Sequence, residues 1–258
     1  MDIKSWIEKQ RFRRRRCLPE WHDNLTKPEG EYQYYDMSQV SIGTLDWIDG
    51  YEKLYDEQTD PMFMSGAPWA SEGDYNADWL VQGISGLSLV MPKETNGQTA
   101  MLSSNFSIKY GTIRALIKLP DVAGAYSAFW LFGKQGAPEC DILEACGHEW
   151  NKVHVTHHWG YDYEDIWGKK STLHNDRYNR RFKPTEKYYM YEIELSPYKV
   201  VYRINGVIVK IMKEGIPSDK QRIIFSLTKG SYCDSSHDEP LDSVARMKIR
   251  FLEVFKKA

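Results

Sequence analysis

The sequence lacks several features that mark common protein classes. It has no run of 18 apolar residues, which argues against a membrane-spanning helix. Its first six residues lack the apolar stretch of a secretory signal peptide, so we expect either that a signal has been removed or that the protein leaves its cell by another route. The net charge of −2 gives no basis for holding nucleic acid by bulk electrostatics.

Cysteine is scarce, and its spacing does not match a metal site. We expect buried free thiols, although the sequence leaves a disulfide open. The four cysteines are Cys17, Cys140, Cys146 and Cys233.

Repeats and low-complexity linkers are also missing, which indicates one domain over residues 31–258 after a charged extension, residues 1–30. The extension contains a basic run at 11–16. Such a run would suit nucleic acid or a membrane surface, but a solvated arm is its commoner state, and we expect the arm.

Strand patterns dominate what the sequence does contain. Apolar and polar residues alternate from residue 87 onward, and the pair Asn205 and Gly206 between two such segments is typical of a type I′ hairpin turn. The chain also has nine Trp and 17 Tyr. Aromatic faces stack on pyranose rings but also fill β-sandwich cores, so this count supports sugar binding only weakly.

Three carboxylates, Glu139, Asp141 and Glu144, lie within six residues of a segment that otherwise resembles a buried strand. Burying a charge costs several kcal/mol unless the charge is paired or used. Because side chains alternate along a strand, Glu144 shares a face with the other two only if a β-bulge adds one residue. The two glutamates could then approach to about 5 Å, the separation of a retaining glycosidase. The alternative is a solvated edge strand with ordinary surface acids.

The order of these motifs resembles glycoside hydrolase family 16 over about residues 84–256. The matching segments are 110–120, 128–133, the acid motif at 139–144, 157–160, 191–197, the hairpin around 205–206 and a closing strand at 247–255. The resemblance implies an all-β fold, a β-jelly-roll sandwich of two antiparallel sheets with a concave substrate cleft.

The resemblance also implies roles for the acids. Glu139 would be the nucleophile and Glu144 the general acid/base, with Asp141 between them. Glu139 must be ionised to attack the anomeric carbon, whereas Glu144 must hold a proton for the departing oxygen. The bulged spacing resembles the branch of laminarinases, agarases and carrageenases. We expect no cofactor and no metal: the chemistry needs none, and Arg250 stands where many relatives carry an Asp that helps bind a structural calcium ion.

Five further residues are candidate substrate contacts. Tyr126 and Trp130 share a face by strand alternation, and the matching family positions line the cleft, although Trp130 could instead pack in the core. His158 matches a family histidine beside the acids, but a lone histidine is more often structural. Trp159 and Trp167 flank a segment that we expect to leave the sheet over the cleft.

The leading hypothesis is a retaining endo-β-glycosidase that hydrolyses a polysaccharide, first a β-1,3-glucan and then a related β-glucan or galactan. A non-catalytic glycan-binding module and a transglycosylase are alternatives, and the acids do not separate hydrolysis from transfer. We expect a monomer whose partner is a polysaccharide, without nucleic acid or a membrane span. A polymeric substrate implies an extracellular or periplasmic location.

Overall fold

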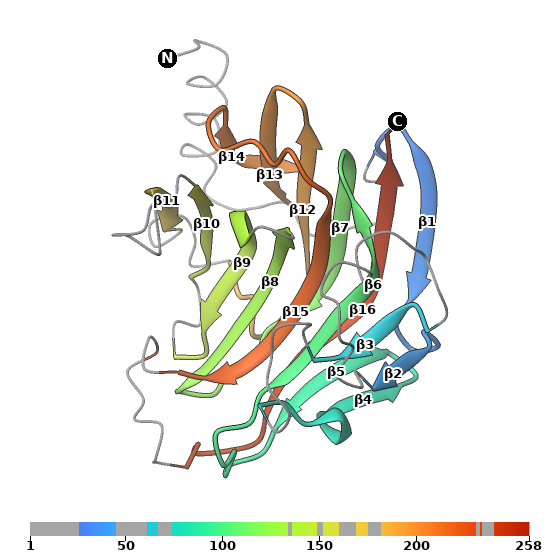
Figure 1. Ribbon diagram of the computed structural model, residues 1–258. Coiled ribbons are helices and arrows are strands. Elements are labelled where there is room, and N and C mark those ends of the chain that lie inside the picture. Colours follow the sequence, from blue (N-terminus) through green and yellow to red (C-terminus); the bar gives the residue numbers. More distant parts are fainter. Residues whose placement is uncertain are drawn as a thin grey trace.

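The computed structural model of the protein contains two eight-stranded β-sheets packed face to face (Figure 1). It describes residues 26–44, 61–66, 74–133, 136–148, 152–159, 169–174, 182–230, 233 and 240–257. Within these ranges η2 (Ala77–Trp79) is a single 3-10 turn, and no helix is long and apolar enough to cross a membrane. The predicted all-β sandwich is confirmed. Residues 1–25 lie outside the description, so the boundary of the charged extension stays a prediction.

The first sheet is built around the long closing strand. In order across this sheet, the strands are β14 (Val207–Met212), β13 (Lys199–Ile204), β12 (Tyr189–Ser196), β7 (Gly111–Lys118), β16 (Ala245–Lys256), β5 (Gly86–Met91) and β4 (Leu80–Gly83), with β1 (Glu31–Asp36) paired to β16. The predicted hairpin is confirmed between β13 and β14. Its turn residues Asn205 and Gly206 have φ of 47° and 75°, as a type I′ turn requires.

The second sheet carries the acid motif. Its strands are, in order, β11 (Lys169–His174), β10 (His154–Trp159), β9 (Gly136–Cys146), β8 (Ala125–Gly133), β15 (Gln221–Lys229), β6 (Ala100–Ile108), β3 (Phe63–Ser65) and β2 (Ile42–Thr44). Neighbours are antiparallel except for β2 and β3, which pair in parallel. The acid-bearing strand β9 therefore has hydrogen-bonded strands on both sides, which excludes the solvated edge strand.

Alternate residues of the second sheet fill the space between the sheets. On β15, Ile223, Phe225 and Leu227 are fully buried, and Phe225 stacks on Phe129 of β8 with 4.6 Å between ring centroids. Each such side chain contributes roughly 1.5 to 3 kcal/mol by leaving water. Because the core uses one side of every strand, the other side of β8, β9, β10 and β15 is left for polar and aromatic groups.

Candidate active site

A β-bulge interrupts strand β9 at Ile142. On the β8 side, Phe129 lies opposite Leu143 while the next residue, Trp130, lies opposite Asp141, so Ile142 is the extra residue. The pairing of β9 with β10 shifts at the same place. The predicted bulge between Asp141 and Glu144 is thus confirmed.

The bulge brings the three acids onto one face. Glu144 lies opposite Ala128 and Asp141 lies opposite Trp130, and these two β8 residues share a face because they are two apart. Glu139 is likewise two residues from Asp141. The three carboxyl groups therefore face away from the inter-sheet core.

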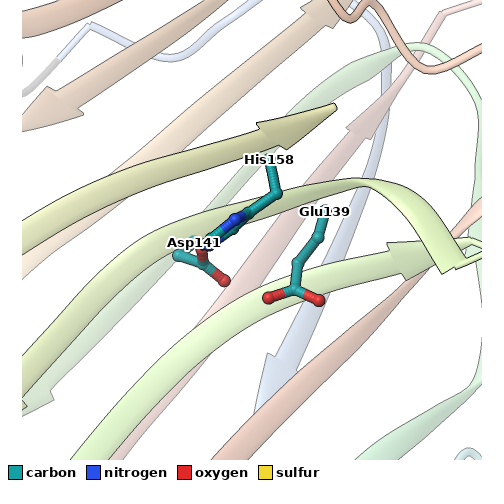
Figure 2. Close-up of side chains that lie close together, drawn as sticks. All are labelled: Glu139, Asp141 and His158. Carbon is teal, nitrogen blue, oxygen red and sulfur yellow. Dashed lines mark ion pairs between the residues drawn. The ribbon is translucent and has the colours of Figure 1, made fainter. Parts of the chain in front are cut away.

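His158 lies directly beside the first two acids (Figure 2). It is opposite Glu139 in the pairing of β10 with β9, and its Nε2 is 3.4 Å from Oδ2 of Asp141. Asp141 in turn hydrogen bonds to the Glu139 side chain. The predicted position of His158 beside the acids is therefore confirmed.

The acids affect one another's protonation. Burial first, and then the nearby charge of Glu144, raise the pKa of Glu139 to about 7, while the hydrogen bond from Asp141 acts in the opposite direction. Burial, followed by the charges of Glu144 and Glu139, raises the pKa of Asp141 well above its usual value. Since close carboxylates disfavour full ionisation, the cluster retains a proton at neutral pH. A protonated Asp141 can donate it in a hydrogen bond to an ionised Glu139.

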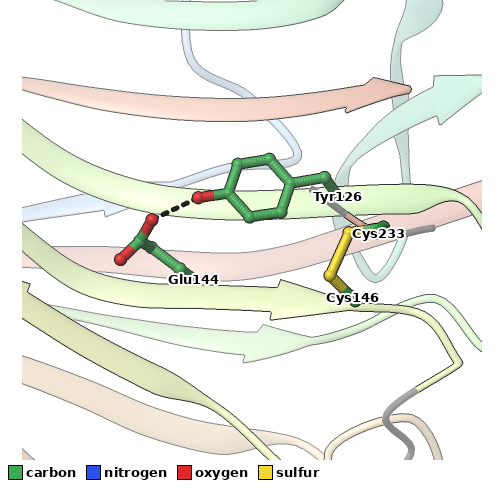
Figure 3. The surroundings of a disulfide bond; sticks show 4 residues. All are labelled: Tyr126, Glu144, Cys146 and Cys233. Carbon is green, nitrogen blue, oxygen red and sulfur yellow. Dashed lines mark hydrogen bonds between the residues drawn. A yellow bond between two sulfur atoms is a disulfide. The ribbon is translucent and has the colours of Figure 1, made fainter. Parts of the chain in front are cut away.

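Two hydroxyl groups hold the third acid. The hydroxyl of Tyr126 donates to Oε1 of Glu144 (Figure 3), and the hydroxyl of Thr156 donates to Oε2. Hydroxyls can also accept, so both partners suit either protonation state of Glu144. Alternation along β10 places Thr156 on the face of His158, but the sequence did not indicate its role. Tyr126 was expected as a substrate contact, and the sequence did not indicate its hydrogen bond to Glu144.

Trp130 lies on the acid face and not in the inter-sheet core. Its Nε1 donates to Oγ of Ser226 on β15 at 3.3 Å, and its ring meets Phe132 edge to face at 5.5 Å between centroids. An indole fixed in this way offers a preorganised surface beside Asp141.

Trp159 is not brought to the acids, so its substrate contact stays a prediction that this geometry does not support. It lies two residues from His157, with 5.7 Å between ring centroids, and His157 points into the core toward Tyr202 of the other sheet. Alternation along β10 therefore turns Trp159 away from His158. Trp167 lies outside the described residues.

Atoms of Glu139, Asp141 and His158 all lie within 4.8 Å of one another, a spacing that a metal ion could bridge. Metal ligation requires deprotonated carboxylates. Within this group Asp141 hydrogen bonds to Glu139, and we interpret the two carboxyls as sharing a proton.

A disulfide lies next to the third acid. Cys146, two residues after Glu144, is bonded to Cys233 (Figure 3). The expectation of free thiols is therefore wrong for this pair, because the fold brings together two residues 87 apart in sequence. Cys140 is buried and free, as expected, and alternation along β9 places it on the face opposite Glu139 and Asp141. Cys17 lies outside the described residues.

A cavity of about 450 Å³ lies on the other sheet, away from the acids. Its lining includes Arg114, which contacts Glu253 at 2.6 Å and Glu192 at 3.7 Å, and Arg203, which contacts Glu192 at 2.9 Å. These charges neutralise one another, as expected of a structural network.

Comparisons with known proteins agree with this geometry. The sequence model of "Glycosyl hydrolases family 16" matches residues 67–251. Congo red hypersensitive protein 1 of Saccharomyces cerevisiae is 22% identical over 178 residues, which are 67% of this chain and 33% of that protein. The chain thus spans about a third of the length of this relative.

Several solved structures share the fold. The catalytic domain of an endo-1,3-β-glucanase (laminarinase) from Thermotoga petrophila RKU-1 superposes with a TM-score of 0.66 at 20% identity, covering 88% of this chain and 99% of that one. The apo Crh5 transglycosylase gives 0.62 at 13% identity, covering 93% and 92%. A Bacillus licheniformis β-glucanase gives 0.62 at 15% identity, covering 88% and 99%. The sequence match extends over more than two thirds of the chain and includes all three acids, so the protein belongs to glycosyl hydrolases family 16.

Proposed function

We propose that the protein is a retaining endo-β-glycosidase that hydrolyses a polysaccharide, with a β-1,3-glucan as the first substrate to test. The observation that carries this proposal is the bulge at Ile142, which gathers Glu139, Asp141 and Glu144 on one face of the sheet. The similarity of the fold to a laminarinase supports the choice of substrate class.

In the first chemical step, a carboxylate oxygen of Glu139 attacks the anomeric carbon and the bond to the leaving oxygen breaks. Glu144 gives its proton to that oxygen. In the second step, Glu144 takes a proton from water, the water oxygen attacks the same carbon, and the ester to Glu139 is released. Two inversions at one carbon give net retention.

The remaining groups prepare the two glutamates for these steps. A protonated Asp141 that donates to Glu139 favours the ionised nucleophile, in line with its effect on the pKa of Glu139. Tyr126 and Thr156 fix the carboxyl of Glu144 through its two oxygens. Trp130 offers its ring face to a pyranose next to the cleaved bond, and His158 aligns Asp141.

The disulfide supports an extracytoplasmic site of action. The bond between Cys146 and Cys233 would persist in an oxidising compartment. A polysaccharide substrate, whether soluble or part of a cell wall, would also be found outside the cytoplasm.

Transfer to a sugar acceptor is the second candidate. It is favoured by the fold similarity to the Crh5 transglycosylase, which covers 93% of this chain. Hydrolysis and transfer share the glycosyl ester on Glu139 and differ only in the molecule that attacks it.

A panel of polysaccharides tests the proposal. We expect wild-type protein to release oligosaccharides from a β-1,3-glucan, with the β-anomer formed first in an NMR time course. Glu139→Gln should abolish release, and Glu186→Gln, which changes an exposed glutamate in an ion pair with Lys183, should leave it intact. Longer products on adding oligosaccharide acceptors would favour transfer. Near wild-type turnover by Glu139→Gln would reject the assignment.

A further inference from the structure

A lysine from the first sheet reaches the back of the acid-bearing strands. Lys210 lies on β14 and is 9% exposed, and its Nζ donates to the backbone oxygen of Val155 on β10 at 3.0 Å. A buried ammonium group is costly unless its partners replace the lost water. The location of Lys210 therefore calls for a structural reason.

Val155 is the β10 residue that faces the bulge. It lies between His154 and Thr156, where the pairing with β9 shifts, and it has no Cα partner among the described residues of β9. A bulge disrupts the local ladder of backbone hydrogen bonds, and buried backbone oxygens need donors. The ammonium group of Lys210 supplies a donor at this irregular point.

The surroundings of Lys210 are polar. Tyr202 pairs with it across the hairpin, and the Tyr202 hydroxyl is 2.7 Å from Nδ1 of His157. Nε2 of His157 donates to the backbone oxygen of Gly215 at 2.8 Å, and Cys140 Sγ lies 3.5 Å from Nδ1. Burial lowers the pKa of His157 to about 4, so the imidazole is neutral. Burial also raises the pKa values of Cys140 and Tyr202, which stay neutral as well.

The charge of Lys210 also acts through the strand on the acid face. Burial and the charges of Glu144 and Glu139 raise the pKa of Asp141, and the charge of Lys210 lowers it by a smaller amount. Asp141 directly follows Cys140, whose side chain belongs to this core cluster. Lys210 is thus linked to the acids by a backbone contact at the bulge and by its charge.

We propose that Lys210 is a positioning residue: by holding the Val155 carbonyl it fixes the bulge, and so keeps Glu144 on the face of Glu139. It touches no substrate and acts through the backbone of β10 and β9. The inference rests on the proposed glycosidase function for its kinetic test, and a second measurement below is independent of activity.

The kinetic test compares Lys210→Met with wild type. We expect kcat to fall about 10- to 100-fold, because misplacing a catalytic group by about 1 Å costs that much. KM should stay within about twofold, because Trp130 and its partner Ser226 lie on β8 and β15, whereas the hydrogen bond from Lys210 goes to β10. In Lys210→Met the acid limb of the pH profile of kcat should move to higher pH, because the charge that lowers the pKa of Asp141 is lost. Lys210→Arg keeps a charged donor and should recover part of kcat.

The control is Lys229→Met, which removes another buried lysine, 7% exposed on β15. It should leave kcat within about twofold of wild type.

Amide hydrogen exchange tests the inference without any substrate. In Lys210→Met, amides 142–144 and 155–156 should exchange at least about tenfold faster than in wild type, with smaller changes elsewhere. Lys229→Met should not reproduce this local effect. If Lys210→Met does not fold, both tests can be made on Lys210→Gln, whose amide donor sits on a shorter side chain. We expect the same changes there: a lower kcat and faster amide exchange at the bulge.

The outcomes separate the two proposals. Unchanged exchange at the bulge together with unchanged kcat in Lys210→Met would overturn the positioning role. Equal losses in Lys210→Met and Lys229→Met would also overturn it, since a general loss of stability would then explain both. If wild type hydrolyses no glycan, the proposed function fails, while the exchange experiment still decides the role of Lys210.

Discussion

Replacing the proposed nucleophile should make the protein more stable at neutral pH. The pKa of Glu139 rises from 4.5 to about 7 on folding, mainly through burial. Below pH 4.5 the carboxyl is protonated in both states and has no effect on stability. Between pH 4.5 and 7 the unfolded state loses its proton while the folded state keeps it, so the free energy of unfolding falls as pH rises.

The size of this effect follows from the shift. Each pKa unit corresponds to about 1.36 kcal/mol, so the ionisable carboxyl costs about 3 kcal/mol of folding free energy above pH 7. Glu139→Gln removes the ionisation but keeps the volume and an oxygen that accepts from Asp141. Its stability advantage over wild type should therefore be near zero at pH 4.5 and approach about 3 kcal/mol above pH 7.

Urea unfolding of both proteins at several pH values measures this difference. The exposed substitution Glu186→Gln serves as the control and should show no comparable pH-dependent gain. An advantage of Glu139→Gln that is the same at acidic and neutral pH, or a loss of stability at neutral pH, would refute the reasoning about burial and charge at this site.

Three further predictions concern neighbouring groups. Tyr126→Phe should lower kcat about tenfold in steady-state assays, because Glu144 loses one of its two hydroxyl partners; an unchanged kcat would contradict this. Trp130→Ala should raise KM for oligosaccharides about tenfold by removing the stacking surface, and a change in kcat alone would argue against that role. Cys233→Ser should lower the free energy of unfolding by about 4 kcal/mol, since the disulfide closes a loop of 87 residues; urea unfolding checks this, and reductant should destabilise wild type but not the variant.

Strand alternation predicted the bulge only together with the expectation that the three acids act at one site. Glu139 and Glu144 are five residues apart, so a regular strand would place them on opposite faces, and only an extra residue reconciles a shared face with a strand. The hairpin at Asn205 and Gly206 was equally accessible, because its turn chemistry is local.

Features that depend on contacts between distant segments could not be predicted. The pairing of Cys146 with Cys233 spans 87 residues, and the bond from Lys210 to the Val155 carbonyl crosses between the two sheets. No local pattern marks either one. Trp159 directly follows His158 in sequence, but alternation along β10 places the two side chains on opposite faces.

The central claim is that Glu139 becomes covalently bonded to the sugar. A 2-deoxy-2-fluoro β-glucan oligosaccharide with a good leaving group slows the second step more than the first, so the glycosyl enzyme should accumulate. Mass spectrometry of the digested protein is predicted to find the fluoroglycosyl group on Glu139, and no such adduct in Glu139→Gln. A label on another residue, or steady turnover of the natural polymer with inversion at the anomeric carbon, would contradict the account.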